Sequence, residues 1–459
     1  MDDGMRIVVI GGGMAGTRLA QQLAPYRSAP GLSVTVVGEE RHPPYNRVLL
    51  AEVLAGRYAP AMITLPGADS ADSAGGTDSG GDGGTGAPRR AVRLDRADRL
   101  VVCDDGTALP YDRLVLATGS NPVLPSLRGL FEEGAGELPL GVHCFRTMDD
   151  CLALASAAGH GTRVVVVGGG LLGVSAAQAL AARGARVVLA QQGEHLMERH
   201  LDGTAAALLR GHLEAQGVEV HTECRARGLL AQRMPDGRRA VRSVELSDGY
   251  CLGAELVVLA CGVRPRAGLA QAAGIDVAKG VVVDDRLRTS DPAVHAIGDC
   301  AQHDGVLYGL AGAARDQADV LARVLAQEAG GAAPESDAPR YTGTRALTRL
   351  TLTPGPGTGT RPTTDTGTGT GAATAPPDAP PLDVAAFGDP VPGPGDDVLP
   401  LTDATRGAYR KVVVRGDRLV GGILLGDLAA VGTVAGVREG DEPLPSAPLL
   451  HLLTDDGGY

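Results

Sequence analysis

Short, uninterrupted runs of valine, isoleucine and leucine recur along the chain and predict buried strands. They are RIVVIGG, SVTVVGE, RLVLATG, RVVVVGG, ARVVLAQ and ELVVLACG. Such runs, without alternating polar residues, are typical of parallel strands that are covered on both faces. Helical patterns follow several of them, including LLGVSAAQALAARG, which ends at Gly184. Alternating strands and helices predict an α/β fold with doubly wound parallel sheets.

Two glycine-rich turns each lie between such a strand and such a helix. Their GxGxxG glycines are Gly11, Gly13 and Gly16 in the first turn, and Gly168, Gly170 and Gly173 in the second, 157 residues later. A turn of this kind brings the backbone N–H groups of a helix N-terminus close to a pyrophosphate. The repetition predicts two Rossmann-like dinucleotide-binding domains.

The C-terminal part has a different pattern. Two strand-like runs flank a Gly-Asp turn in YRKVVVRGDRLVGGILLGD, residues 409–427, and predict a hairpin in a small α+β domain. Residues 67–88 and 353–381 are rich in Gly, Ser, Thr, Pro and Asp and nearly free of large apolar side chains. They cannot offset their own ordering entropy by burial, which predicts flexible surface loops.

Composition and charge limit the classes of partner that we expect for this chain. The 459 residues are 44% hydrophobic and carry 54 acidic against 42 basic residues, a formal charge of -12. This balance disfavours nucleic acid and anionic membranes as partners. The one uncharged run long enough to span a membrane, 164–182, has a glycine triplet near its start, so we interpret it as a buried strand–turn–helix. The start, MDDGM, lacks the basic region of a signal peptide, and we expect a cytoplasmic protein with no membrane partner.

The cysteines and histidines predict no metal site. Seven cysteines stand at scattered spacings without a CxxC pair, and ten histidines form no HxH or HxxxH pair. This pattern argues against a disulfide framework, a zinc finger and a cysteine-ligated iron–sulfur cluster. We expect Cys300 to be a buried small hydrophobe and His303 to lie in a loop.

Three strand ends offer groups to a bound dinucleotide. Glu39 ends the strand after the first glycine turn, where a carboxylate can accept hydrogen bonds from a ribose. The end of YDRLVLATGS would let the backbone pass close to a ligand, and Asp299, just after Gly298, could accept hydrogen bonds from a polyol. In this order the segments resemble the FAD-binding segments of the pyridine nucleotide-disulfide reductase-like superfamily.

Three further segments resemble a smaller group of proteins within this superfamily. PPYNRVLLAEVLAG, the stretch from LLGVSAAQAL to HLMERHLD, and LYGLAGAARDQADVLA are similar to the FAD-containing portion of assimilatory NAD(P)H nitrite reductase large subunits and their stand-alone electron-transfer relatives. This resemblance covers most of residues 5–330, with weaker similarity to about residue 430. It implies a FAD domain at 1–145 and 276–335, an inserted NAD(P)H domain at 146–275 and a C-terminal domain at 340–435.

The resemblance also implies a set of cofactor-binding residues. For FAD these are Gly11, Gly13, Met14, Ala15, Gly16, Glu39, Arg47, Ala117, Thr118, Gly119, Gly298 and Asp299. For NADH or NADPH they are Gly168, Gly170, Leu171, Leu172, Gly173, Gln191 and Gly262. A surface salt bridge is the alternative role for Arg47. No catalytic side chain is implied, because the flavin carries the chemistry.

The function implied is an FAD-dependent NAD(P)H oxidoreductase that passes electrons to a separate redox protein, a nitrite or nitrate reductase. A reductase of a small iron–sulfur carrier, such as rubredoxin or ferredoxin, is one alternative. A non-catalytic FAD-binding protein with a lapsed NAD(P)H site is another. The assembly could be a homodimer.

Three departures from the family pattern refine this expectation. No cysteine cluster is present for an iron–sulfur or sirohaem centre, so we expect that the chain does not reduce nitrite by itself. No cysteine precedes Cys103, which disfavours the disulfide reductases. Ser175 stands where many relatives carry a glutamate near the nicotinamide, and Gln191 stands at the acidic ribose position. The choice between NADH and NADPH stays open, with NADH favoured.

Overall fold

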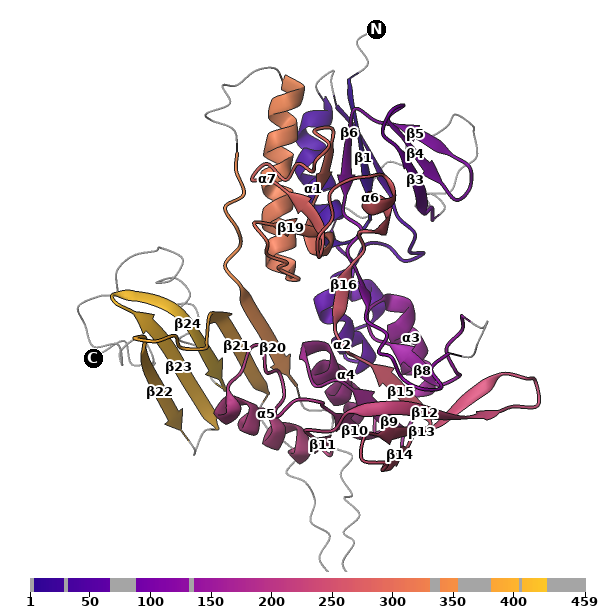
Figure 1. The fold of residues 1–459 in the computed structure, drawn as a ribbon, viewed down its shortest axis with the longest axis vertical. Helices are drawn as coiled ribbons and strands as arrows, with labels where there is room; N and C mark the ends of the chain where they lie inside the picture. Colours follow the sequence, from indigo (N-terminus) through magenta and orange to yellow (C-terminus); the bar gives the residue numbers. More distant parts are fainter. Residues whose placement is uncertain are drawn as a thin grey trace, which may run out of the picture. The chain divides into compact units, whose positions relative to one another are not determined.

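The computed structural model describes residues 4–28, 32–66, 88–131, 136–330, 339–353, 381–403 and 407–426 (Figure 1). The segments 67–88 and 353–381 lie outside these residues, apart from Pro88, Thr353 and Pro381. The chain divides into two compact units. The first comprises Met1–Leu49, Ala59–Asn121 and Val263–Ala346, and the second Leu50–Tyr58, Pro122–Gly262 and Leu347–Tyr459. The domain boundaries expected from the sequence remain a prediction.

The first unit is built on a four-stranded parallel sheet of order β18-β6-β1-β2. Its strands are β1 (Met5–Ile10), β2 (Leu32–Val37), β6 (Arg113–Leu116) and β18 (Val294–Ala296). Val9 and Val115 are completely buried, as expected for strands covered on both faces. The helices α1 (Met14–Leu23) and α7 (Ala311–Gly330) pack side by side (Figure 1).

Smaller elements lie wholly or, for β7, mostly in the first unit. They are the antiparallel β3 (Ala91–Asp95), β4 (Leu100–Cys103) and β5 (Ala108–Pro110); the pairs β7 (Ser120–Pro122) with β16 (Val263–Pro265) and β17 (Val281–Val283) with β19 (Ala301–His303); the helix α6 (Gly268–Ala272); and the 3-10 turns η1 (Ala24–Ser28), η2 (Arg47–Leu49), η3 (Pro60–Ile63) and η5 (Gly298–Cys300).

The second unit contains a five-stranded parallel sheet of order β11-β10-β9-β15-β8. Its strands are β8 (Val142–Cys144), β9 (Arg163–Val167), β10 (Arg186–Ala190), β11 (Glu219–His221) and β15 (Leu256–Leu259). With it come α2 (Leu50–Leu54), α3 (Met148–Ala157), α4 (Leu171–Ala182), α5 (Gly203–Ala215) and the antiparallel β12 (Ala226–Arg233), β13 (Arg239–Leu246) and β14 (Cys251–Gly253).

The helix α4 explains the membrane-like run in the sequence. Every residue from Gly173 to Leu180 is buried, so the helix is covered on all sides and needs no polar face. Its length is only 12 residues. Within the described ranges, no helix is long and apolar enough to cross a membrane.

The C-terminal part of the second unit is an antiparallel sheet of order β20-β21-β24-β23-β22. Its strands are β20 (Leu347–Leu352), β21 (Leu382–Gly388), β22 (Asp397–Asp403), β23 (Ala408–Arg415) and β24 (Arg418–Leu425). The turn between β23 and β24 lies at Gly416, which has φ +63°, so the predicted hairpin is confirmed. Between 339 and 426 the described residues include no helix, and the helical part of the predicted α+β domain remains a prediction.

One carboxylate ties this sheet to the rest of the second unit. Asp202 caps α5 by accepting a hydrogen bond from the Ala205 N–H at 3.0 Å. The same carboxylate accepts hydrogen bonds from the Tyr409 hydroxyl at 2.8 Å and the Lys411 ammonium at 3.0 Å. Two residues of β23 therefore hold the sheet at the start of α5.

A buried histidine in the first sheet makes stability depend on pH. His295 of β18 is completely buried, and among the described residues neither ring nitrogen has a hydrogen-bond partner. Burial, with a smaller effect of the Arg113 charge, lowers the pKa of this imidazole to about 3. An unfolded histidine titrates at about 6.5, so only the unfolded chain takes up this proton as the pH falls below that value. His295 should therefore reduce stability by up to about 1.4 kcal/mol per pH unit below about pH 6.5.

We expect His295→Leu to remove this share of the acid sensitivity. Relative to the wild type, the variant should gain about 2 kcal/mol in free energy of unfolding between about pH 7.5 and about pH 5. Urea unfolding at the two pH values measures the gain. His160→Leu, at an exposed histidine, is the control and should gain far less. An equal gain in both variants would contradict the assignment to His295.

Candidate dinucleotide-binding sites

The first glycine turn is held tightly between neighbouring strands. Gly11 has φ +118°, and a Cβ there would overlap the carbonyl oxygen of Ala117 at the end of β6. Its N–H donates to the carbonyl oxygen of Val37 in β2 at 2.8 Å. Gly16, in α1, faces the carbonyl oxygen of Gly11 with no room for a Cβ. Two of the three glycines are thus required by close packing of backbone on backbone.

The middle glycine of this turn has a different environment. Gly13 is the N-cap of α1, with φ -77°, and provides no side-chain cap. A Cβ at Gly13 would meet no heavy atom within 4 Å. The space in front of the first turn of α1 is therefore open. This is where a dinucleotide fold admits the pyrophosphate to the helix N-terminus, and the residues present fit such a group.

The second glycine turn has the same geometry. Gly168 has φ +111°, a Cβ there would overlap the Ala260 carbonyl oxygen, and its N–H donates to the Ala190 carbonyl oxygen at 2.8 Å. Gly173 lies against the Gly168 carbonyl oxygen without room for a Cβ. Gly170 caps α4 with φ -77°, and a Cβ there would meet nothing within 4 Å. In both units the start of the helix is therefore open at the middle glycine of the turn.

A further glycine with free space at its Cβ position follows the strand beside each glycine turn. Gly119, after β6, has φ +73°, and Gly262, after β15, has φ +94°. A Cβ would meet no heavy atom within 4 Å at either position. The Thr118 hydroxyl donates to the carbonyl oxygen of Arg266 at 2.7 Å, which orients this segment. The predicted backbone positions thus lie at the carboxyl edges of the two parallel sheets.

Asp299 lies close to the first glycine turn. The preceding Gly298 has φ +76°, and a Cβ there would lie 3.1 Å from the Cβ of Ala15 in α1. The Asp299 carboxylate accepts a hydrogen bond from the Ser120 hydroxyl at 2.8 Å. The Gly298 N–H donates to the Gln317 side-chain oxygen at 2.7 Å. The structure thus brings Asp299 to the edge where Met14, Ala15 and Gly16 begin α1.

Sequence reasoning missed Ser120 and Gln317. Gln317 is only 1% exposed and lies on the buried face of α7 among Ala314, Ala318 and Leu321. A lone amide at a core position of an amphipathic helix is a detectable signal, because buried polar groups require partners. Ser120 offered no such signal, since serine is common at strand ends.

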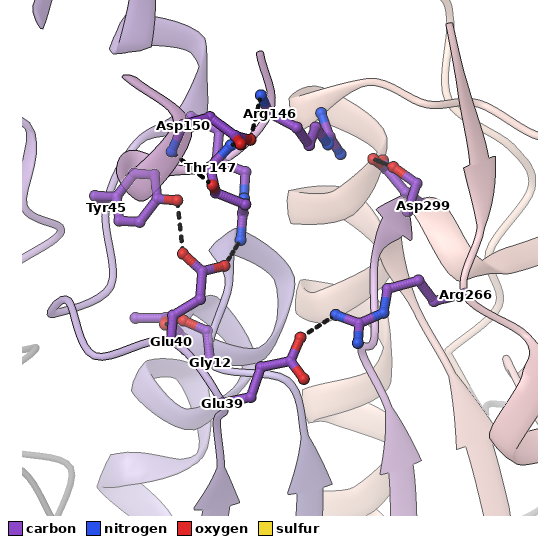
Figure 2. Close-up of polar contacts among 12 residues, drawn as sticks. Gly12, Glu39, Glu40, Tyr45, Arg146, Thr147, Asp150, Arg266 and Asp299 are labelled. Atoms are coloured by element: carbon purple, nitrogen blue, oxygen red, sulfur yellow. Dashed lines mark hydrogen bonds and ion pairs between the residues drawn. The ribbon is translucent and has the colours of Figure 1, made fainter. Parts of the chain in front are cut away.

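The acidic residues after β2 are paired with arginines (Figure 2). Glu39 lies beyond the end of β2 and forms an ion pair with Arg266, whose hydrogen bond lowers the pKa of this carboxyl. Glu40 accepts a hydrogen bond from the Tyr45 hydroxyl at 2.7 Å and pairs with Arg47. The Arg47 guanidinium lies 5.1 Å from the Tyr45 ring centroid. The expectation that Glu39 ends the strand is wrong by two residues, and contacts of Glu39 and Arg47 with FAD remain predictions.

Polar side chains at the second turn form hydrogen bonds with the protein's own backbone. The Gln191 side-chain oxygen, directly after β10, accepts a hydrogen bond from the Gly169 N–H at 2.8 Å. The Ser175 hydroxyl is buried and donates to the Leu171 carbonyl oxygen at 2.8 Å, within α4. Leu171 and Leu172 form the first turn of that helix. A role for Ser175 near the nicotinamide remains a prediction.

Burial raises the pKa of several thiols, and the assignment of His303 to a loop is wrong. All seven cysteines are described and free, and burial raises the pKa of Cys144 and Cys261 to about 11. Cys300 is completely buried, as predicted. His303 does not lie in a loop: it belongs to β19, paired with β17, and its Nε2 lies 3.1 Å from Asp285. Its ring packs edge-on against Tyr341, which favours the strand position.

Comparison with known proteins identifies the family of this chain. Residues 5–318 match the family described as pyridine nucleotide-disulphide oxidoreductase, and residues 381–435 match the rubredoxin NAD+ reductase C-terminal domain. The nitrite reductase (NAD(P)H) of Bacillus subtilis is 30% identical over 92% of this chain and 46% of its own length. The assimilatory nitrate reductase electron transfer subunit of the same organism is 34% identical over 72% of this chain and 41% of its own length.

Other relatives are of similar size to this chain. The rubredoxin-NAD(+) reductase of Pseudomonas putida is 32% identical over 66% of this chain and 74% of its own length. A ferredoxin reductase of Rhodopseudomonas palustris has a TM-score of 0.70 at 25% identity, covering 92% of this chain and 91% of its own. A putidaredoxin reductase–putidaredoxin complex has a TM-score of 0.75 at 22% identity, covering 98% of each chain. By contrast, the chain spans less than half of the two Bacillus relatives.

Two dinucleotide folds followed by an antiparallel domain define an NAD(P)H-dependent flavin oxidoreductase. The chain belongs to the pyridine nucleotide-disulphide oxidoreductase family, whose members bind FAD and NAD(P)H.

Proposed function

We propose that this chain binds FAD at the first glycine turn and NAD(P)H at the second, and delivers electrons to a separate redox protein of nitrate or nitrite assimilation. The observation that carries this proposal is the pair of equivalent openings at Gly13 and Gly170, each at the start of a helix. Bound FAD supplies the conversion between the two electrons of a nicotinamide and the single electrons of a carrier.

In this proposal the chain's own residues bind and orient. The two helix N-termini hold the pyrophosphates, and Asp299, oriented by Ser120, accepts hydrogen bonds from the polyol chain of FAD. Burial raises the pKa of the Cys144 and Cys261 thiols to about 11, which disfavours an electron relay through these two thiols, and the proposal places the acceptor on another molecule. The identity of the two Bacillus relatives favours nitrite or nitrate reductase as that acceptor.

A second candidate is a reductase of rubredoxin or ferredoxin. The match of residues 381–435 to the rubredoxin NAD+ reductase C-terminal domain favours it, as does the fuller coverage of the Pseudomonas putida relative. The two candidates share the nucleotide sites and differ only in the protein that receives electrons.

Anaerobic stopped-flow mixing tests both. The FAD-loaded protein is mixed with NADH or NADPH while the visible flavin absorbance is followed, and rubredoxin, ferredoxin or a sirohaem nitrite reductase is then added. Rapid bleaching followed by reduction of the sirohaem protein supports the first candidate. Reduction of rubredoxin or ferredoxin alone supports the second. No bleaching with either nucleotide would show that the chain is a non-catalytic flavoprotein.

A further inference from the structure

The loop after β10 forms a wall of the second glycine turn. The Met197 N–H donates to the Gly169 carbonyl oxygen at 2.9 Å, so the loop folds back onto the turn. A Cβ on Gly169 would lie 2.6 Å from a methyl carbon of Leu196 and 3.0 Å from the Cβ of Gln191. The end of this second strand is where dinucleotide folds recognise the adenosine ribose, with or without its 2′-phosphate.

The ribose-recognising position itself carries no charge. Gln191 uses its side-chain oxygen to accept the Gly169 N–H, which leaves its amide N–H groups as donors. An amide N–H of Gln191 can donate a hydrogen bond to a ribose hydroxyl or to a 2′-phosphate equally well. Gln191 alone therefore does not distinguish NADH from NADPH.

A carboxylate of the loop lies near the same end of β10 instead. Glu198 is exposed, and its carboxylate lies against the backbone of Gly193, where a Cβ would overlap both carboxylate oxygens. One of these oxygens is 3.4 Å from the His195 N–H, which donates to it. Gly193 is two residues after Gln191, so the negative charge lies at the same end of β10 as the ribose position.

We infer that Glu198 makes the second site selective for NADH over NADPH. A 2′-phosphate carries nearly two negative charges at neutral pH, and a nearby carboxylate repels it while leaving a 2′-hydroxyl unaffected. The selecting charge is thus supplied by residue 198 of the loop, in place of the strand-end residue 191. A side chain at Gly193 would displace the Glu198 carboxylate, because a Cβ there would overlap both carboxylate oxygens. This inference rests on the proposed function, which places NAD(P)H at the second turn.

Calorimetric titration of the FAD-loaded protein with NAD+ and NADP+ tests the inference, with kcat/KM for NADH and NADPH as a second readout. The wild type should bind NAD+ more tightly than NADP+. Glu198→Gln should tighten NADP+ binding by about tenfold and change NAD+ binding by less than about twofold. Gly193→Ala, which displaces the carboxylate without removing it, should shift the ratio in the same direction. Glu194→Gln, at an exposed glutamate of the same loop, is the matched control and should leave the ratio unchanged.

The outcomes separate this inference from the proposed function. Tighter NADP+ than NAD+ binding by the wild type, or an unchanged ratio in Glu198→Gln, overturns the selectivity of Glu198 while the second turn remains a nucleotide site. Binding of neither nucleotide overturns both the inference and the proposed site. Selective binding without reduction of any carrier protein overturns only the proposed activity.

Discussion

Gly170→Val is expected to prevent reduction of the flavin by NADH and NADPH while FAD stays bound. Gly170 has φ -77°, which valine adopts readily, and a Cβ there meets no protein atom within 4 Å. Loss of a glycine N-cap costs the fold only about 1 kcal/mol. The added side chain instead fills the space that the pyrophosphate requires. NAD(P)H binding should weaken by about a hundredfold or more, equivalent to about 2.7 kcal/mol.

The control is the equivalent change in the other turn. Gly13 has the same φ of -77° and the same open surroundings, so Gly13→Val should give folded protein that has lost FAD. Flavin content after purification and stopped-flow reduction by NADH distinguish the two variants. Gly173→Ala should instead destabilise the fold, because its Cβ would overlap the Gly168 carbonyl oxygen. We expect a lower melting temperature for this variant. Reduction of Gly170→Val at the wild-type rate would show that NAD(P)H binds elsewhere.

Asp299→Ala is expected to yield protein with little bound FAD. The carboxylate is held by the Ser120 hydroxyl at 2.8 Å, and Gly298 brings it next to Ala15 at the start of α1. Hydrogen bonds to a charged group contribute about 1.5–3 kcal/mol each, so two lost bonds to the FAD polyol would weaken binding by at least about a hundredfold. The ratio of flavin to protein absorbance after gel filtration measures the loss.

Two further variants define what this result means. Asp276→Ala removes an exposed carboxylate of the same unit and should keep full flavin content. Ser120→Ala leaves the Asp299 carboxylate in place but removes its hydroxyl donor, and should lower FAD affinity by about tenfold. Full flavin occupancy in Asp299→Ala would show that the carboxylate does not contact FAD.

Much of the fold could be predicted because its signals are local. Uninterrupted Val/Ile/Leu runs predicted β1, β2, β6, β9, β10 and β15, all of which lie in parallel sheets. The hairpin at Gly416 was predicted from its turn residues in the same way. Hydrophobic periodicity and backbone preferences act over a few residues, so a single sequence displays them. The strand after the first glycine turn, β2, ends two residues before the predicted end at Glu39. The reason is that the end of β2 depends on its pairing with β1.

The side-chain partners at the sites depend on contacts distant in the sequence. Ser120 and Asp299 are 179 residues apart, and Glu39 and Arg266 are 227 apart. Neither pairing has a local signature, because each exists only where the ends of separate strands meet at one edge of a sheet. The same holds for His303, whose strand forms only by pairing with β17.

By itself the sequence determined the two glycine turns and the strands and helices around them, since these follow from backbone sterics and apolar periodicity. Only the tertiary structure decided that Gly13 and Gly170 are open while Gly16 and Gly173 are closed, because that difference depends on where other backbone atoms lie. It also decided where a carboxylate of the loop after β10 lies. The sequence shows a neutral Gln191 at the end of β10, whereas the folded loop places the Glu198 carboxylate against Gly193, two residues beyond it.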